Sequence, residues 1–195
     1  MGEHLATPEA ILTSAATLLR EMPFDDIAYR SLGESVGVSE RTVYRHFPTR
    51  PHLLSALARW LEDQVLPPPT FTDWESFLHV VETRFSDFDR APSYAHLMAR
   101  AEAISPVGPD HSSFFAEAVR ALVSTVAPGL ARRDAGRLCA GLVNVASAQF
   151  WARCRTGLDM DVEGTSAAFR RIAEQLRASF PETAFASHRA AEAAP

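Results

Sequence analysis

The chain has 195 residues, 47% of them hydrophobic, and a formal net charge of −5 at pH 7. This composition allows a sizeable buried core, and no window approaches the roughly 18 consecutive apolar residues of a membrane span, so we expect a cytoplasmic protein without a signal peptide. All 19 basic residues are arginine, which excludes lysine Schiff-base chemistry and a Walker-type phosphate loop.

Apolar residues recur at helical spacing along most of the chain, and no segment alternates as a strand would. The first third predicts four helices, over residues 8–21, 28–35, 39–46 and 49–65. Pro23 ends the first helix, because the residue before a proline avoids the helical region. Gly37 permits a left-handed turn after the second, and Ser39 caps the third.

The sequence "PPP" at residues 67–69 marks a boundary in the chain, and a second helical region follows it. Five helices are predicted there, over residues 72–89, 92–104, 111–127, 131–156 and 162–179. The fold class is therefore all-α, with about nine helices.

The third predicted helix carries the most informative pattern. Residues 27–59 contain five arginines against two acids, on a chain that is acidic as a whole. On a helical wheel, Val43 and Phe47 share one face, and Arg41 and Arg45 lie opposite. Two short helices joined by a glycine turn, the second with arginines outward, are typical of a helix-turn-helix.

Arginine on such a helix can make bidentate contacts to guanine in a major groove, and neighbouring polar groups suit phosphates. The candidate DNA-binding residues are Arg30, Ser39, Arg41, Thr42, Tyr44, Arg45, His46 and Arg50. Two arginines four residues apart are more often just a solvated helix face. The combination of short helix, Gly-Val turn, serine cap and His-Phe-Pro sequence favours the DNA-binding interpretation.

The stretch "VGVSERTVYRHFPTRPHLL", with "AILTSAATLLREMPFDDIAYRSLGE" before it, resembles the N-terminal DNA-binding domain of the TetR family of transcriptional regulators. Five positions depart from the family pattern. Arg41 replaces a common glycine, which we interpret as an added base or phosphate contact. Pro23 stands for the usual glycine, Ala28 for a capping threonine, and Arg50 for the usual lysine. Gly33 replaces a core alanine, which we expect to loosen the second helix by about 0.5–1 kcal/mol.

The resemblance implies a helix-turn-helix domain over 1–50, a helical ligand-binding and dimerisation domain over 51–180, and a flexible tail over 181–195. It also implies a homodimer, whose two recognition helices would lie roughly 34–36 Å apart to read a palindrome. Candidate interface residues on the last two predicted helices are Ala140, Gly141, Leu142, Val145, Ala148, Trp151, Phe169, Ile172 and Leu176. The alternative is that these residues pack within one chain.

A small-molecule pocket is expected among the fifth to eighth predicted helices, from apolar walls with a few polar groups. Its candidate residues are Trp74, Phe77, His79, Phe88, His96, Met98, Phe114, Phe115, Asn144 and Gln149. For each aromatic residue, ordinary core packing is the competing interpretation. A metal site at His79, His96 and His111 is conceivable but has no recognisable spacing, so we expect no metal and no cofactor.

These features predict a ligand-responsive transcriptional regulator, a repressor, that binds palindromic operator DNA as a homodimer. The sequence contains no G-x-S-x-G, H-E-x-x-H or C-x-x-C motif and no glycine-rich phosphate loop, so we do not expect an enzyme. Two alternatives stay open. One is a TetR-like ligand-binding protein without DNA binding, which Pro23 and Ala28 favour, and the other is an all-helical enzyme.

Overall fold

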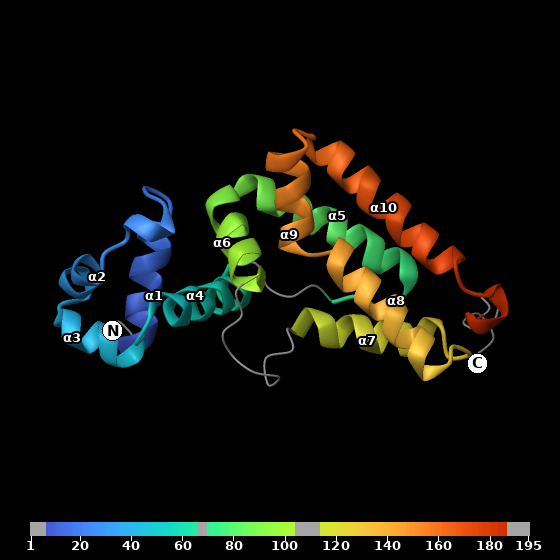
Figure 1. Ribbon diagram of the computed structural model, residues 1–195, viewed down its shortest axis with the longest axis horizontal. Coiled ribbons are helices and arrows are strands. Elements are labelled where there is room, and N and C mark those ends of the chain that lie inside the picture. The colour runs from blue at the N-terminus through green and yellow to red at the C-terminus, as the bar shows by residue number, and fades with distance from the viewer. Residues whose placement is uncertain (1–6, 66–69, 104–113, 187–195) are drawn as a thin grey trace, which may run out of the picture. The chain divides into compact units, whose positions relative to one another are not determined.

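The computed structural model describes residues 7–65, 70–103 and 114–186 (Figure 1). These residues form ten α-helices with short 3-10 and π-helical turns, and no β-strand occurs among them. None of the described helices is both long and apolar enough to cross a bilayer. The predicted all-α fold class is confirmed.

The chain divides into two compact units. The N-terminal unit contains α1 (Thr7–Leu18), η1 (Phe24–Asp26), α2 (Tyr29–Val36), α3 (Glu40–His46), α4 (Arg50–Gln64) and α6 (Pro92–Ala103). The C-terminal unit contains α5 (Trp74–Arg90), α7 (Phe114–Val126), α8 (Arg132–Val145), α9 (Ala148–Ala152), η2 (Arg153–Gly157), α10 (Val162–Ala178) and η3 (Glu182–Ala184). The predicted boundary at residue 50 separates α4 from the helix-turn-helix, whereas the compact N-terminal unit includes both α4 and α6. A functional division at residue 50 stays a prediction.

Two glycines shape the connection between α2 and α3. Gly37 ends α2 with φ 76° and ψ 29°, the left-handed conformation expected for it. Gly33 lies within α2, where an added Cβ would be only 2.7 Å from the carbonyl oxygen of Val38. The glycine at position 33 therefore has a packing role as well as an effect on helix stability. Because it lacks a side chain, the backbone of Val38 and Ser39 can lie directly against α2.

We expect Gly37→Ala to lower the free energy of unfolding by about 1 kcal/mol, because a Cβ disfavours the left-handed region. Gly136→Ala is the matched control. Gly136 lies within α8 at ordinary φ, and an added Cβ there meets nothing within 4 Å. This control should stabilise the protein by up to about 1 kcal/mol, through helix propensity. Urea denaturation measures both, and a loss of the same size in both variants would contradict the left-handed explanation.

Aromatic rings from α5, α9 and α10 fill the core of the C-terminal unit. Phe169 of α10 packs edge-on against Phe77 and Phe85 of α5, with ring centroids 5.9 and 5.7 Å apart. Trp151 of α9 packs in the same way on Phe88, at 5.6 Å. All five side chains are essentially inaccessible to solvent. Edge-to-face pairs add to the free energy gained by burying these rings, so this cluster stabilises the unit beyond the burial of its apolar area.

Ser147 divides the helix that the sequence predicts over residues 131–156. α8 ends at Val145, and α9 begins at Ala148. The Ser147 hydroxyl donates a hydrogen bond to the Asn144 carbonyl (2.7 Å) and accepts one from the Phe150 N–H (3.1 Å). One side chain thus serves the end of one helix and the start of the next, which is why the continuous-helix prediction is wrong.

The first residues of the predicted tail lie against the end of α7. The Gly129 N–H donates to the Ala184 carbonyl (3.0 Å), and the Ala186 N–H donates to the Val126 carbonyl (2.8 Å). The side chain of Ala184 is buried. Residues 181–186 are therefore part of the folded unit, and residues 187–195 lie outside the described residues.

Candidate nucleic-acid interface

α3 is seated on the N-terminal unit by the two side chains that the helical wheel assigns to its inner face. Val43 is 0% exposed and Phe47 is 6% exposed. Ser39 caps the helix, since its hydroxyl accepts a hydrogen bond from the Thr42 N–H (3.2 Å) and lies 2.9 Å from the Thr42 hydroxyl. The predicted cap is confirmed, and it occupies polar atoms of Ser39 and Thr42 before any ligand arrives.

The opposite face of α3 carries positive charge into solvent. Arg41 and Arg45 are exposed, and neither forms an ion pair with another described residue. Tyr44, between them, keeps half of its surface exposed. Guanidinium groups without a protein partner are free to meet an external anion, so this face suits phosphate or base contacts.

Two other candidate residues differ from this pattern. Arg30 on α2 is exposed, but its Nε donates to Glu34 one turn later, at 2.9 Å. The His46 Nε2 is enclosed and has no hydrogen-bond partner among the described residues. A DNA contact through this nitrogen would require the imidazole ring to turn outward.

Arg50 lies in a different place from the one the sequence suggests. Its guanidinium is half-buried and donates hydrogen bonds to the carbonyls of Ile27 and Phe24, in the segment before α2. It also lies over the Phe24 ring, 4.4 Å from the centroid. This group is directed into the protein, so the phosphate contact expected of it is not what the geometry offers.

Tyr29 is a residue of this region that the sequence reasoning missed. It begins α2, is 5% exposed, and packs on Tyr44 of α3 with ring centroids 4.5 Å apart. Burial raises the pKa of the Tyr29 hydroxyl above its usual value. An aromatic residue in the first turn of the helix preceding the glycine turn is the signal that could have identified this support.

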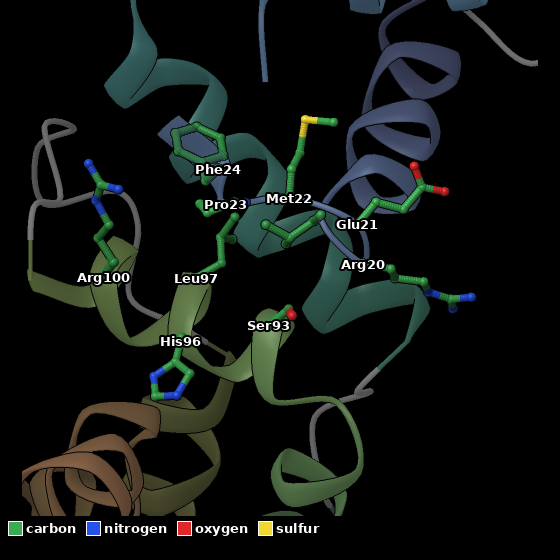
Figure 2. A pocket seen from close by; sticks show the side chains of 10 residues that line it. Arg20, Glu21, Met22, Pro23, Phe24, Ser93, His96, Leu97 and Arg100 are labelled. Atoms are coloured by element: carbon green, nitrogen blue, oxygen red, sulfur yellow. The ribbon is translucent and has the colours of Figure 1, made fainter. Parts of the chain in front are cut away.

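A groove of about 410 Å³ opens within the N-terminal unit, between the end of α1 and α6 (Figure 2). Leu19, Met22 and Leu97 contribute apolar lining. Arg100 of α6 lies beside it and donates to Asp25 (2.7 Å), which holds the pKa of that carboxyl below its usual value. Of the predicted ligand-pocket residues, His96 lines this groove, which α6 forms with the end of α1 and not with the other helices expected to line the pocket.

The remaining predicted pocket residues are divided between core and surface. Trp74, Phe77, Phe88, Met98 and Phe115 are buried, whereas His79, Asn144 and Gln149 are exposed. The Asn144 side chain donates to the Ala140 carbonyl of its own helix (3.1 Å). The burial of the aromatic residues agrees with the core-packing interpretation. His79, Asn144 and Gln149 are exposed and do not lie in that aromatic core. The Phe114 side chain lies outside the described residues.

The predicted dimer residues are similarly divided. Leu142, Ala148, Trp151 and Phe169 are at most 2% exposed within the single chain, so they belong to its own core. Gly141 lies against Leu176, because a Cβ there would be 2.8 Å from the Leu176 side chain. The small residue at this position thus permits α8 and α10 to pack within one chain. Ala140 remains exposed, and Val145 and Ile172 are half-buried.

No group of three histidine, cysteine, aspartate or glutamate side chains among the described residues could hold a metal ion. His79 and His96 lie on α5 and α6, and His111 lies outside the described part of the chain. The structure therefore adds no support to the alternative of a histidine metal site.

Residues 11–57 match the family model described as "Bacterial regulatory proteins, tetR family". This N-terminal region is a TetR-family domain. The match covers α1 to the first half of α4, and so contains Arg41, Tyr44 and Arg45.

Curated relatives match part of the chain. The nucleoid occlusion factor SlmA of Shewanella amazonensis is 36% identical over 64 residues, which is 33% of this chain and 32% of SlmA. SlmA of Shewanella pealeana is 38% identical over 58 residues, 30% of this chain and 29% of that protein. The chain thus matches these relatives over about a third of their length.

Solved structures extend the TetR likeness to the fold of the whole chain. A TetR transcriptional regulator from Rhodococcus sp. RHA1 superimposes with a TM-score of 0.62 and 18% identity, covering 90% of this chain and 97% of that one. A TetR variant from Acinetobacter baumannii AYE, solved in complex with minocycline, gives 0.62 and 19% identity with the same coverage. The C-terminal helices therefore have a TetR-like arrangement that the family model does not reach.

Proposed function

We propose that this chain is a transcriptional regulator that binds double-stranded DNA through α3. The observation that carries the proposal is the division of α3 into two faces, with Val43 and Phe47 buried and Arg41 and Arg45 exposed and unpaired among the described residues. A local cationic face on an acidic chain attracts a polyanion without making the whole surface adhesive. The TetR-family domain around α3 supports the same conclusion.

The proposal includes a homodimer that acts as a repressor in the cytoplasm and responds to a small molecule. Two copies of α3 on one dimer would read the two halves of a palindrome, about one helical turn apart. A ligand changes DNA affinity only if it binds differently to the two states of the dimer. The effector part of the proposal is supported by the TetR-like fold, since one such structure was solved with minocycline.

Selection of bound sequences from random DNA, followed by salt titration of the best site, tests the proposal. We expect palindromic sites, and an affinity that falls steeply between roughly 50 and 200 mM salt. Arg45→Gln and Arg41→Gln should each weaken DNA binding. A lost base contact costs about 1–3 kcal/mol of binding free energy, whereas a lost phosphate contact also reduces the slope of log affinity against log salt by about 1.

Arg171→Gln is the matched control, because Arg171 is an exposed arginine of α10 in the other unit. It should leave both affinity and salt slope unchanged. Binding that persists unaltered in the Arg41 and Arg45 variants would move the interface away from α3. Absence of DNA binding even at low salt would favour a ligand-binding protein with a TetR-like fold.

A further inference from the structure

The guanidinium of Arg50 ties the first turn of α4 to the segment that leads into α2. Its Nη1 donates to the Ile27 carbonyl at 2.5 Å, and its Nη2 donates to the Phe24 carbonyl. The same group lies 4.4 Å from the centroid of the Phe24 ring. These carbonyls precede α2. The Phe24 carbonyl also accepts a hydrogen bond from the Ile27 N–H (3.3 Å), so Arg50 adds a second donor at Phe24 and a donor for the Ile27 carbonyl.

The contacts continue from Arg50 to the exposed face of α3. The Arg50 Cζ lies 5.7 Å from the centroid of the Tyr29 ring, on the first residue of α2. Tyr29 in turn packs on Tyr44, with centroids 4.5 Å apart. Tyr44 is an exposed residue of α3 that follows Arg41 and precedes Arg45 in the sequence. These contacts therefore join α4 and the start of α2 to a residue beside the two exposed arginines.

We propose that Arg50 is a positioning residue for DNA binding, which sets the orientation of Tyr44 through Tyr29 and makes no phosphate contact itself. This inference rests on the proposed function. The two carbonyls take two of the five guanidinium N–H donors, and the Phe24 ring lies against the face of the group, so Arg50 is held by the protein and not directed outward as Arg41 and Arg45 are. An arginine fits this place because its planar group donates in two directions while it stacks on a ring, which a lysine ammonium does not reproduce.

Salt dependence distinguishes positioning from direct contact. A lost phosphate contact lowers the slope of log affinity against log salt by about 0.9, whereas a lost positioning group lowers affinity at constant slope. We expect Arg50→Gln to weaken binding to the selected DNA site by about tenfold or more with an unchanged slope, like other losses of orientation. Arg45→Gln, on the exposed face, is the matched variant that changes the slope if Arg45 contacts phosphate.

Arg50→Lys gives the second readout, because it keeps the charge and loses the two-directional donor. Under the proposal it binds DNA as weakly as Arg50→Gln. Tyr29→Leu tests the same set of contacts without altering any charge, and should weaken binding at constant slope. Its effect should be non-additive with Arg50→Gln, by about fivefold in a double-mutant cycle, since residues in contact are coupled. Circular dichroism shows whether each variant folds. If an Arg50 variant does not fold, the DNA affinity and salt slope of Tyr29→Leu test the proposal in its place.

Three outcomes would overturn the inference. They are full binding by Arg50→Lys, a slope reduced by Arg50→Gln, and additive effects of Tyr29→Leu and Arg50→Gln. The first two would show that Arg50 acts as a charge, and the third would show that it does not act through Tyr29. Failure of the proposed function has a different signature, because then the wild-type protein itself binds no DNA.

Discussion

Replacing Trp151 with alanine is expected to lower the free energy of unfolding by about 3–5 kcal/mol. The side chain is 1% exposed, packs on Phe88, and donates its indole N–H to Asp89 at 2.9 Å. The substitution removes the largest fully buried side chain of the unit and leaves an acceptor with one donor fewer. Because whole domains are stable by about 5–15 kcal/mol, urea denaturation should show a large fall in midpoint.

Trp151→Phe separates the two causes of this loss. It keeps most of the buried ring and removes the indole N–H, so we expect it to cost about 1–3 kcal/mol. Asp89 also accepts a hydrogen bond from Arg155 at 2.9 Å, which limits the loss in the phenylalanine variant. Equal destabilisation by the two variants would mean that the hydrogen bond, and not ring packing, holds α9 to α5.

Leu32→Ala should have the second largest effect, a loss of about 2–5 kcal/mol in the free energy of unfolding. Leu32 is 0% exposed in α2, in the same core as Val43 of α3. A cavity there removes support from beneath the recognition helix. We therefore expect DNA affinity to fall with temperature earlier than in the wild type, which fluorescence anisotropy against temperature would measure.

Leu158→Ala is the control for this prediction, because it makes the same chemical change at a side chain that is 65% exposed. Surface substitutions of this kind usually change stability by less than about 0.5 kcal/mol. If Leu32→Ala were as mild as Leu158→Ala, α2 would not provide the buried support that the structure indicates for α3.

The recognition helix could be predicted from sequence because its two faces differ in chemistry. Val43 and Phe47 are apolar and four residues apart, Arg41 and Arg45 are charged, and periodicity alone assigns them to opposite sides. Apart from the predicted helix over 131–156, which Ser147 divides, the other helix boundaries are also close to prediction, since proline, glycine and capping residues act locally. Such signals depend on neighbours in the chain and need no knowledge of the tertiary fold.

Arg50 could not be placed from sequence, because its partners are backbone carbonyls. Phe24 and Ile27 would offer the same acceptors with almost any side chain, so no residue pattern reveals that α4 begins beside them. A basic residue next to a cationic helix therefore reads in the sequence as part of its surface. The contacts of Arg50 with the two carbonyls depend on the packing of segments that are distant in the sequence.

The small residues of α8 show a related limit. A stripe of small side chains indicates that some helix approaches closely, but it does not identify which helix. In the structure, Gly141 faces Leu176 of the same chain, whereas Ala140 is exposed. The sequence thus predicted the close approach correctly, but could not assign it to a partner copy or to α10.

The hydroxyl of Tyr94 in α6 accepts a hydrogen bond from Arg20 at 2.6 Å and donates one to the Ala16 carbonyl at 3.1 Å. Ala16 lies in the last turn of α1 and Arg20 just after its end, and the tyrosine is 4% exposed. Arg20 is exposed, so water can replace its bond to Tyr94, whereas the bond to the Ala16 carbonyl is buried. A slide of α6 along α1 would leave the Tyr94 hydroxyl and the Ala16 carbonyl without that bond and away from water, so sliding between these two helices is expected to be resisted.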